Sequence, residues 1–133
     1  MNEQVVGREQ TKRAIAFCCA MLGKDNEMQK QYESFSTYAK ANEMAIGVTF
    51  RANARMESFT YRSLRLRAKY REFDVLLVPE LDALGNSPIE ITHEINFLTE
   101  NGIIVISLKD GELNVETLPL LFRKMFRLVE HNS

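Results

Sequence analysis

Residues 79–88, "PELDALGNSP", form a short polar loop between an apolar run and a helix start. In proteins that alternate strands with helices, ligands bind in such loops, beyond the carboxyl ends of parallel strands. Glu80 and Asp82, together with Asp25, could suggest an acidic magnesium pocket. However, Pro79 and Glu80 stand where that pocket would need an aspartate at the strand end. The loop therefore has the place of a functional site without an evident catalyst.

The two cysteines and two histidines are the other candidates for chemistry. Cys18 and Cys19 are adjacent in an apolar run, and a disulfide between neighbours on a strand would be strained. His93 and His131 lie far from them in the sequence, so neither a metal site nor a nucleophile–histidine pair is indicated. We expect both thiols to be buried and unreactive, and we expect no cofactor or metal.

A basic segment spans residues 51–71 and contains Glu57 as its only acid. Such a segment could bind a phosphate backbone or an acidic partner, because arginine pairs with phosphate through two hydrogen bonds. It could equally be a solvated helix face balanced by the acidic segment that follows. The net charge of -1 adds no general signal for nucleic acid. The cations are Arg51, Arg55, Arg62, Arg65, Arg67, Lys69 and Arg71.

The last helix expected in the chain, residues 116–130, carries a wide apolar arc. The arc is wider than one face of a sheet normally covers, so we expect part of it to meet another subunit. The alternative is a terminal helix that is simply well buried. The residues expected at the interface are Leu118, Leu121, Phe122, Met125, Phe126 and Val129.

Strand and helix patterns alternate along the chain, which predicts an α/β fold. The fold expected is a three-layer arrangement with a mostly parallel sheet of four to five strands and helices on both faces. "DVLLV" (74–78) lacks polar alternation, which indicates burial on both faces. Strands are expected at 13–21, 44–50, 74–78 and 103–108, with a short edge strand near 112–115 and helices from 25 or 26, over 57–71 and from 88.

The third helix has the clearest predicted ends. Ser87, Pro88 and Glu90 are typical of an N-cap, a first helical position and a capping box. Asn101 and Gly102 suit a left-handed stop. The residues on one side of this helix are Ile91, Glu94, Ile95 and Leu98, an apolar stripe with one polar break.

Length and composition indicate one ordinary globular domain over residues 1–133, with residues 1–11 expected to be flexible and no separate DNA-binding domain. No apolar run approaches the roughly 18 residues needed to span a membrane. The polar N-terminus, "MNEQVVGREQTK", lacks a signal-peptide core, so we expect a cytoplasmic protein.

The order of these elements, with several motifs, resembles the serine recombinase family, the resolvases and invertases. "FDVLLVPELDALGNSPIEITHEINFLTENGIIVISL" (73–108) is similar to that family's third strand, Leu-Asp-Arg-Leu-Gly-Arg loop, next helix and fourth strand. "RAIAFCCAM" (13–21) is similar to its first strand. "QYESFSTYAKAN" (31–42) matches the following helix, with Gln31 at the usual glutamine, whereas residues 44–65 align poorly.

The resemblance implies a fold that cleaves DNA through a serine on the first strand and arginines that hold the phosphate. The nucleophile position falls on Met21 and the first-strand arginine on Cys19. The two loop arginines fall on Ala83 and Asn86, while Asp82 stands as in the family. A thioether has no ionisable proton, and Cys19 lacks an identified cation to lower its pKa. Cleavage by the family mechanism is therefore not expected.

The sequence thus predicts a catalytically inactive serine-recombinase-like domain that works as a dimeric regulatory or interaction module. Its partner would be a second copy or a related recombinase. Two alternatives stay open: a divergent active recombinase, or a DNA-binding protein that does not cleave and uses residues 51–71.

Overall fold

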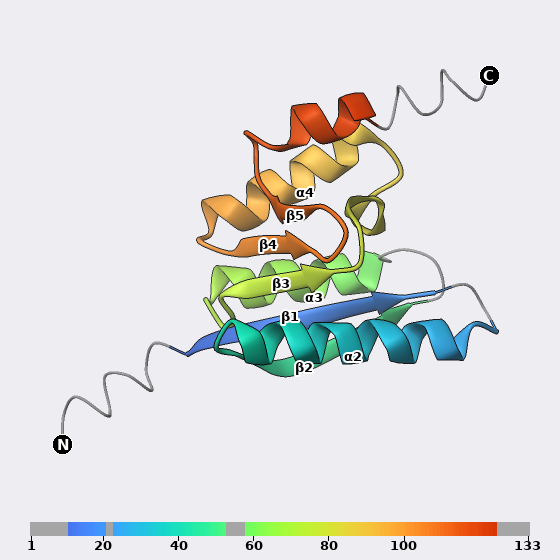
Figure 1. The fold of residues 1–133 in the computed structure, drawn as a ribbon. Helices are drawn as coiled ribbons and strands as arrows, with labels where there is room; N and C mark the ends of the chain where they lie inside the picture. Colours follow the sequence, from blue (N-terminus) through green and yellow to red (C-terminus); the bar gives the residue numbers. More distant parts are fainter. Residues whose placement is uncertain (1–10, 21–22, 53–57, 125–133) are drawn as a thin grey trace.

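The computed structural model describes residues 11–20, 23–52 and 58–124, with the side chain of Ser58 left out. Figure 1 shows strands and helices alternating along the chain. Residues 118–124 form a further helix, drawn in red. The elements are β1 (Lys12–Cys19), α2 (Asp25–Ala41), β2 (Met44–Ala52), α3 (Ser58–Lys69), β3 (Val75–Val78), a short 3₁₀ helix η1 (Leu81–Leu84), α4 (Pro88–Glu100), β4 (Ile104–Ser107) and β5 (Gly111–Leu113).

The sheet has five strands in the order β2-β1-β3-β4-β5. The pairs β1–β2, β1–β3 and β3–β4 are parallel, and only β5 runs antiparallel to its neighbour β4. The β4–β5 turn is tight because Gly111 adopts a left-handed backbone with φ 85°. The predicted mostly parallel sheet with a short edge strand is confirmed.

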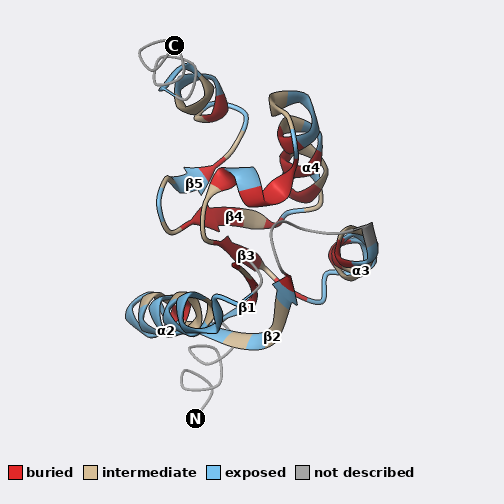
Figure 2. Ribbon diagram, turned by 90° about the vertical axis from the view of Figure 1, so that its right-hand side faces the viewer, coloured by how far each residue is buried: buried red, intermediate tan, exposed pale blue. Residues whose placement is uncertain are grey.

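Helices cover both faces of the sheet, as Figure 2 shows: α2 lies on one side, and α3 and α4 lie on the other. Alternate side chains of β3 enter two separate apolar clusters. Val75 and Leu77 pack on the side of Phe35 from α2, and Leu76 and Val78 pack on the side of α3 and α4. All four are buried, as the unbroken apolar run predicts. None of the described helices is long and apolar enough to cross a membrane.

Several predicted boundaries move by one or two residues for local reasons. β1 ends at Cys19, and the next backbone N–H, that of Ala20, donates to the carbonyl of Ala52 at 3.2 Å. Helix α3 ends before Arg71, which takes a left-handed conformation with φ 52° and donates its N–H to the carbonyl of Ala68. β2 runs on to Ala52, two residues beyond the predicted end.

Helix α4 begins at the predicted cap. The Ser87 hydroxyl accepts the N–H of Glu90 at 3.2 Å, and Pro88 occupies the first turn. The Glu90 carboxylate accepts the N–H of Asn86 at 2.9 Å instead of the N–H of Ser87, so the capping box reaches one residue further back than expected. Gly102, with φ 83°, follows the helix end as predicted. The stripe is buried throughout: Ile91, Glu94, Ile95 and Leu98.

Candidate functional site

The strand-end loop, residues 79–86, joins β3 to α4 and contains η1. Leu81, Ala83 and Leu84 are buried, whereas Asp82 and Asn86 are exposed. The alternation arises because the short 3₁₀ turn directs its apolar side chains into the cluster beneath α3 and α4. The apolar residues of the loop therefore set its shape, and its polar residues face outward.

Neighbouring elements hold the strand-end loop on both sides. The N–H of Leu81 donates to the Asp110 carboxylate at 3.2 Å, and that carboxylate also accepts the Ser107 hydroxyl at 2.9 Å. From α3, the Tyr61 hydroxyl donates to the carbonyl of Leu84. Each of these bonds satisfies a buried or partly buried polar group and ties the loop to a neighbouring element.

Gly85 allows the strand-end loop to approach α4 closely. Its backbone is extended, with φ 173°, so a left-handed conformation is not the reason for glycine here. A Cβ at this position would lie 2.9 Å from the Cβ of Glu90 and 3.2 Å from the backbone nitrogen of Ile91. The loop and the first turn of α4 could not pack together with a larger residue.

Cys19 and Gln31 lie together at the end of β1. The Gln31 side chain accepts the N–H of Cys19 at 2.9 Å and donates to the carbonyl of Cys19 at 2.7 Å. Both ends of the amide are thus used to fix the strand end onto α2. Met21, the position matching the family nucleophile, lies outside the described residues.

The Cys19 thiol is not activated. Burial, with a smaller contribution from the carboxylates of Asp82 and Glu80, raises its pKa to about 11. Cys18 is buried as predicted, and burial likewise raises the pKa of its thiol to about 11. Cys19 is only partly buried, contrary to expectation, but it is a neutral thiol at pH 7 all the same.

The strand-end loop carries the acidic residues Glu80 and Asp82 and no basic residue, whereas a phosphate site needs positive charge. Ala83 is 1% exposed and packs in the core, and Asn86 is exposed without a charge. The ammonium group of Lys109 pairs with Glu80 at 3.2 Å, and this hydrogen bond raises the pKa of Lys109. Among the described residues, no group of three or more histidine, cysteine or acidic side chains is placed to hold a metal ion.

The basic segment divides into paired and exposed cations. Arg65 forms an ion pair with Glu94, and its guanidinium lies 6.0 Å from the ring centroid of Tyr61 and 5.7 Å from that of Phe97. Arg67 pairs with Glu72 at 3.4 Å. Within the part of the chain that the structure describes, no ion pair is found for the exposed residues Arg51, Arg62, Lys69 and Arg71. Arg55 lies outside that part.

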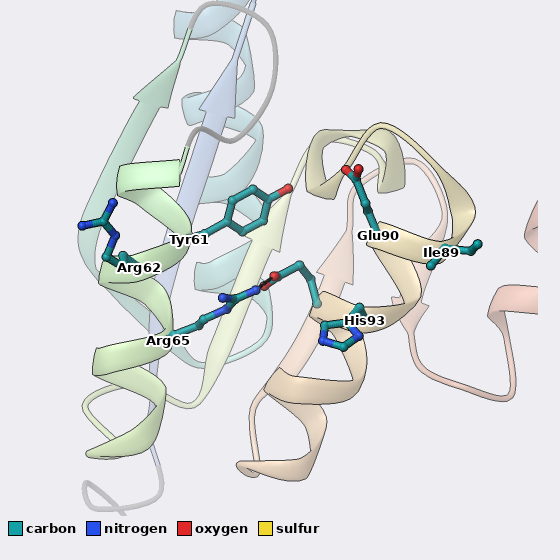
Figure 3. A pocket seen from close by; sticks show the side chains of 7 residues that line it. Tyr61, Arg62, Arg65, Ile89, Glu90 and His93 are labelled. Carbon is teal, nitrogen blue, oxygen red and sulfur yellow. Dashed lines mark hydrogen bonds and ion pairs between the residues drawn. The ribbon is translucent and has the colours of Figure 1, made fainter.

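A groove of about 450 Å³ lies between α3 and α4. Figure 3 shows Tyr61 and Arg65 reaching from α3 toward the loop and α4, whereas Arg62, which also lines the groove, points its guanidinium away from α4. Ile89 and His93 line the α4 side. The sequence prediction missed this groove, although the polar break at Glu94 in a buried stripe was a signal that α4 meets a cation there.

The predicted interface on the last helix is partly internal. Leu118 is 2% exposed and belongs to the core, and Leu121 and Phe122 are partly buried against it. Phe122 also lines a hollow of about 360 Å³ beside Ile89 and His93. Met125, Phe126 and Val129 lie outside the described residues.

Solved structures similar to this fold include recombinase and integrase domains. A resolvase family site-specific recombinase from Streptococcus pneumoniae is 11% identical, with a TM-score of 0.69 over 91% of this chain and 89% of that one. The N-terminal catalytic domain of TP901-1 integrase is 20% identical, with a TM-score of 0.66 over 91% and 96%. The C-terminal catalytic domain of ISC1926 TnpA, an IS607-like serine recombinase, is 16% identical, with a TM-score of 0.64 over 74% and 71%.

No protein-family model and no curated protein sequence matches the chain. The likeness to the solved structures extends over nine-tenths of the chain in two of the three cases. The resolvase-like α/β fold expected from the sequence is therefore confirmed.

Proposed function

We propose that the chain is a catalytically inactive serine-recombinase-like domain that acts in the cytoplasm as a regulatory or interaction module. The observation that supports this proposal is the lack of an activated nucleophile and of loop arginines among the described residues of the strand-end loop and at the neighbouring Cys19. Burial and the carboxylates of Asp82 and Glu80 keep the Cys19 thiol neutral by raising its pKa, and Ala83 and Asn86 stand at the positions matching the family's loop arginines.

Phosphodiester cleavage requires a nucleophile and donors for the charge that develops on the phosphate. The position matching the nucleophile is Met21, whose thioether cannot attack phosphorus as a serine hydroxyl does. Loss of one charge-stabilising donor weakens transition-state stabilisation by about 3–4 kcal/mol, by analogy with an oxyanion hole. Groups that act as a unit fail together, so several losses leave no useful remnant of activity.

Incubation with supercoiled plasmid, followed by denaturing gels, tests the inactive state. We expect neither nicked plasmid nor a covalent protein–DNA adduct, while an active resolvase on its own site serves as the positive control. An adduct formed by the wild-type chain would contradict the proposal and favour a divergent active recombinase. Loss of that adduct in Cys19→Ala would then identify the nucleophile.

The proposed module is a dimer, formed either by two copies or with a related recombinase, through the apolar side of the last helix. The partly buried Leu121 and Phe122 support this because both could bury further area against a partner. Size-exclusion chromatography with light scattering should give a homodimer at micromolar concentration, and Leu121→Asp should shift it toward monomer. A strictly monomeric wild-type chain that also fails to bind a related recombinase would contradict this part.

A second candidate function is DNA binding without cleavage. The observation in its favour is the exposure of Arg51, Arg62 and Lys69, none of which has an ion-pair partner among the described residues. Retention of duplex DNA should then fall as salt rises, because each neutralised phosphate releases counterions. The double variant Arg62→Glu with Lys69→Glu should weaken retention, and an unchanged affinity would remove this candidate.

A further inference from the structure

Helix α3 exposes large apolar side chains on the face that points away from the core. Phe59 is 74% exposed, Leu66 is 58% exposed and Tyr70 is 67% exposed. Their spacing of seven and four residues places them on one side of a helix. The N–H of Tyr70 donates to the carbonyl of Leu66 at 3.2 Å, so the helical spacing continues through Tyr70.

The opposite face of the same helix is buried in the core. Thr60, Leu64 and Ala68 are buried against the sheet side of α3. The exposed apolar residues therefore cannot be explained as core residues. We call Phe59, Leu66 and Tyr70, together with Arg62 and Lys69, the α3 ridge.

The charges on the α3 ridge are all positive. Arg62 and Lys69 are exposed, and α3 has no acidic residue between positions 58 and 69. Figure 3 shows the guanidinium of Arg62 directed away from α4, so it is not drawn into the pair that Arg65 makes with Glu94. The ridge thus offers both apolar area and cations to an approaching molecule.

Exposed large apolar residues are concentrated on the α3 ridge compared with the rest of the described surface. Six large apolar residues are exposed among the described residues, and three of them lie on the α3 ridge. The other three, Ile89, Val115 and Leu120, lie on other elements. Single exposed apolar residues are normal, but a group rimmed by polar residues marks an interaction site.

The nature of the α3 ridge identifies the class of partner. A phosphate backbone would satisfy Arg62 and Lys69 but would leave the aliphatic side chain of Leu66 in water. A protein surface with apolar residues flanked by carboxylates would cover both. An amphipathic helix supplies this arrangement, because its apolar side chains recur every three to four residues along one side.

We propose that the α3 ridge docks an acidic amphipathic helix of a partner protein. This inference rests on the proposed role as an interaction module and names the partner's chemistry. The apolar side of the partner helix packs on Phe59, Leu66 and Tyr70. Its carboxylates pair with Arg62 and Lys69, which speeds the encounter and excludes basic competitors.

Two synthetic helical peptides test the α3 ridge directly. Both carry leucines at helical spacing on one face; one has glutamates beside them, and its matched control has lysines in their place. Fluorescence anisotropy with the full chain should show binding of the glutamate peptide and none of the lysine peptide. Leu66→Asp and Arg62→Glu should each weaken binding by about tenfold or more, a change of about 1.4 kcal/mol.

Matched variants separate docking from folding. Val115 is 55% exposed and Leu66 is 58% exposed, so Val115→Asp places the same charge on an equally exposed apolar site elsewhere. It should leave peptide affinity unchanged. Lys40→Glu, on the exposed surface of α2, controls for Arg62→Glu in the same way. Thermal unfolding by circular dichroism should give the same midpoint for every variant, because all four sites are exposed.

Several outcomes would overturn the docking proposal. These are no binding of the glutamate peptide, equal binding of the lysine peptide, and tighter binding to phosphatidylglycerol vesicles or to a thymidine oligonucleotide. Self-association that disappears in Leu66→Asp would assign the ridge to a second copy instead. A covalent adduct in the plasmid assay would contradict catalytic inactivity alone, whereas failed peptide binding without cleavage would contradict only this inference.

Discussion

The strand-end loop and helix α3 differ in what their side chains do. In the loop, the apolar residues Leu81 and Leu84 are buried and the backbone is held by Asp110 and Tyr61. In α3, one face is buried in the same way, but the other face carries apolar and basic side chains into solvent. The loop, residues 79–86, contains no basic residue, whereas the helix exposes Arg62 and Lys69.

The difference shows that the shape of the strand-end loop does not depend on the groups that would do chemistry in it. Burial of leucines, a close approach at Gly85 and a capped helix are sufficient to form the loop. Arginines add charge stabilisation for a phosphate but little packing. The fold therefore forms without basic residues in this loop, whatever the chemistry of the site.

The largest expected effect comes from putting an arginine back into the loop. Ala83→Arg should destabilise the fold by about 2–4 kcal/mol, because Ala83 is 1% exposed and a long charged side chain would have to displace the core. Asn86→Arg, at the other position matching a family arginine, is the control and should stay within about 0.5 kcal/mol. Urea unfolding of both variants measures this, and equal stability would show that the loop is less tightly packed than described.

The next effect concerns the contact between the loop and α4. Gly85→Ala places a Cβ 2.9 Å from the Cβ of Glu90, so we expect a loss of about 1–3 kcal/mol in the free energy of unfolding. Gly47→Ala in β2 is the matched control, since a Cβ there would meet no atom within 4 Å. If both substitutions had the same effect, the close approach at Gly85 would not be what holds the loop.

Much of the fold could be predicted because its signals are local. Ser87, Pro88 and Gly102 set the ends of α4 through their own backbone preferences, and the unbroken run of β3 indicated a central strand. The strand order β2-β1-β3-β4-β5 depends on contacts between residues far apart in the sequence, and the sequence analysis did not predict it.

The site was less predictable because its contacts join elements that are far apart in sequence. The sequence analysis placed Arg65 in a possible binding surface, but in the structure Arg65 forms an ion pair with Glu94, 29 residues later. The sequence analysis treated this helix as a basic surface and did not identify Phe59 and Leu66 as exposed apolar residues on it. A basic helix gives the same sequence pattern whether its cations are paired or free.

The two ion pairs of the basic segment, Arg65–Glu94 and Arg67–Glu72, should differ in how much they contribute to stability. The Glu94 side chain is 10% exposed and that of Arg65 is 45% exposed, so Arg65→Met leaves a buried carboxylate and should lower stability by about 1–2 kcal/mol. Arg67→Met removes a pair whose side chains are 35% and 51% exposed, and it should change stability by less than about 1 kcal/mol. A double-mutant cycle with Glu94→Gln measures the coupling free energy between the two side chains. A coupling near zero would show that the ion pair does not contribute to stability.

The last effect concerns the thiols of Cys18 and Cys19; it is absent at neutral pH and appears only at high pH. Folding raises the pKa of Cys19 from 9.0 to about 11, so the unfolded chain ionises first as pH rises. Stability should be unaffected by these thiols below pH 9 and should fall between pH 9 and pH 11. Because lysine and tyrosine also titrate there, the measurement is the difference in unfolding free energy between the wild type and a variant with Cys18→Ala and Cys19→Ala.

Alkylation gives an independent reading of the same pKa. At pH 9 the thiolate fraction of Cys19 should be about fifty-fold lower in the folded chain than in urea, with iodoacetamide labelling slowed in proportion. Fast labelling of the folded chain at Cys19 would instead mean that a cation lowers its pKa. The strand-end loop would then no longer differ from α3 in lacking an available positive charge, and a nucleophilic role for Cys19 would have to be reconsidered.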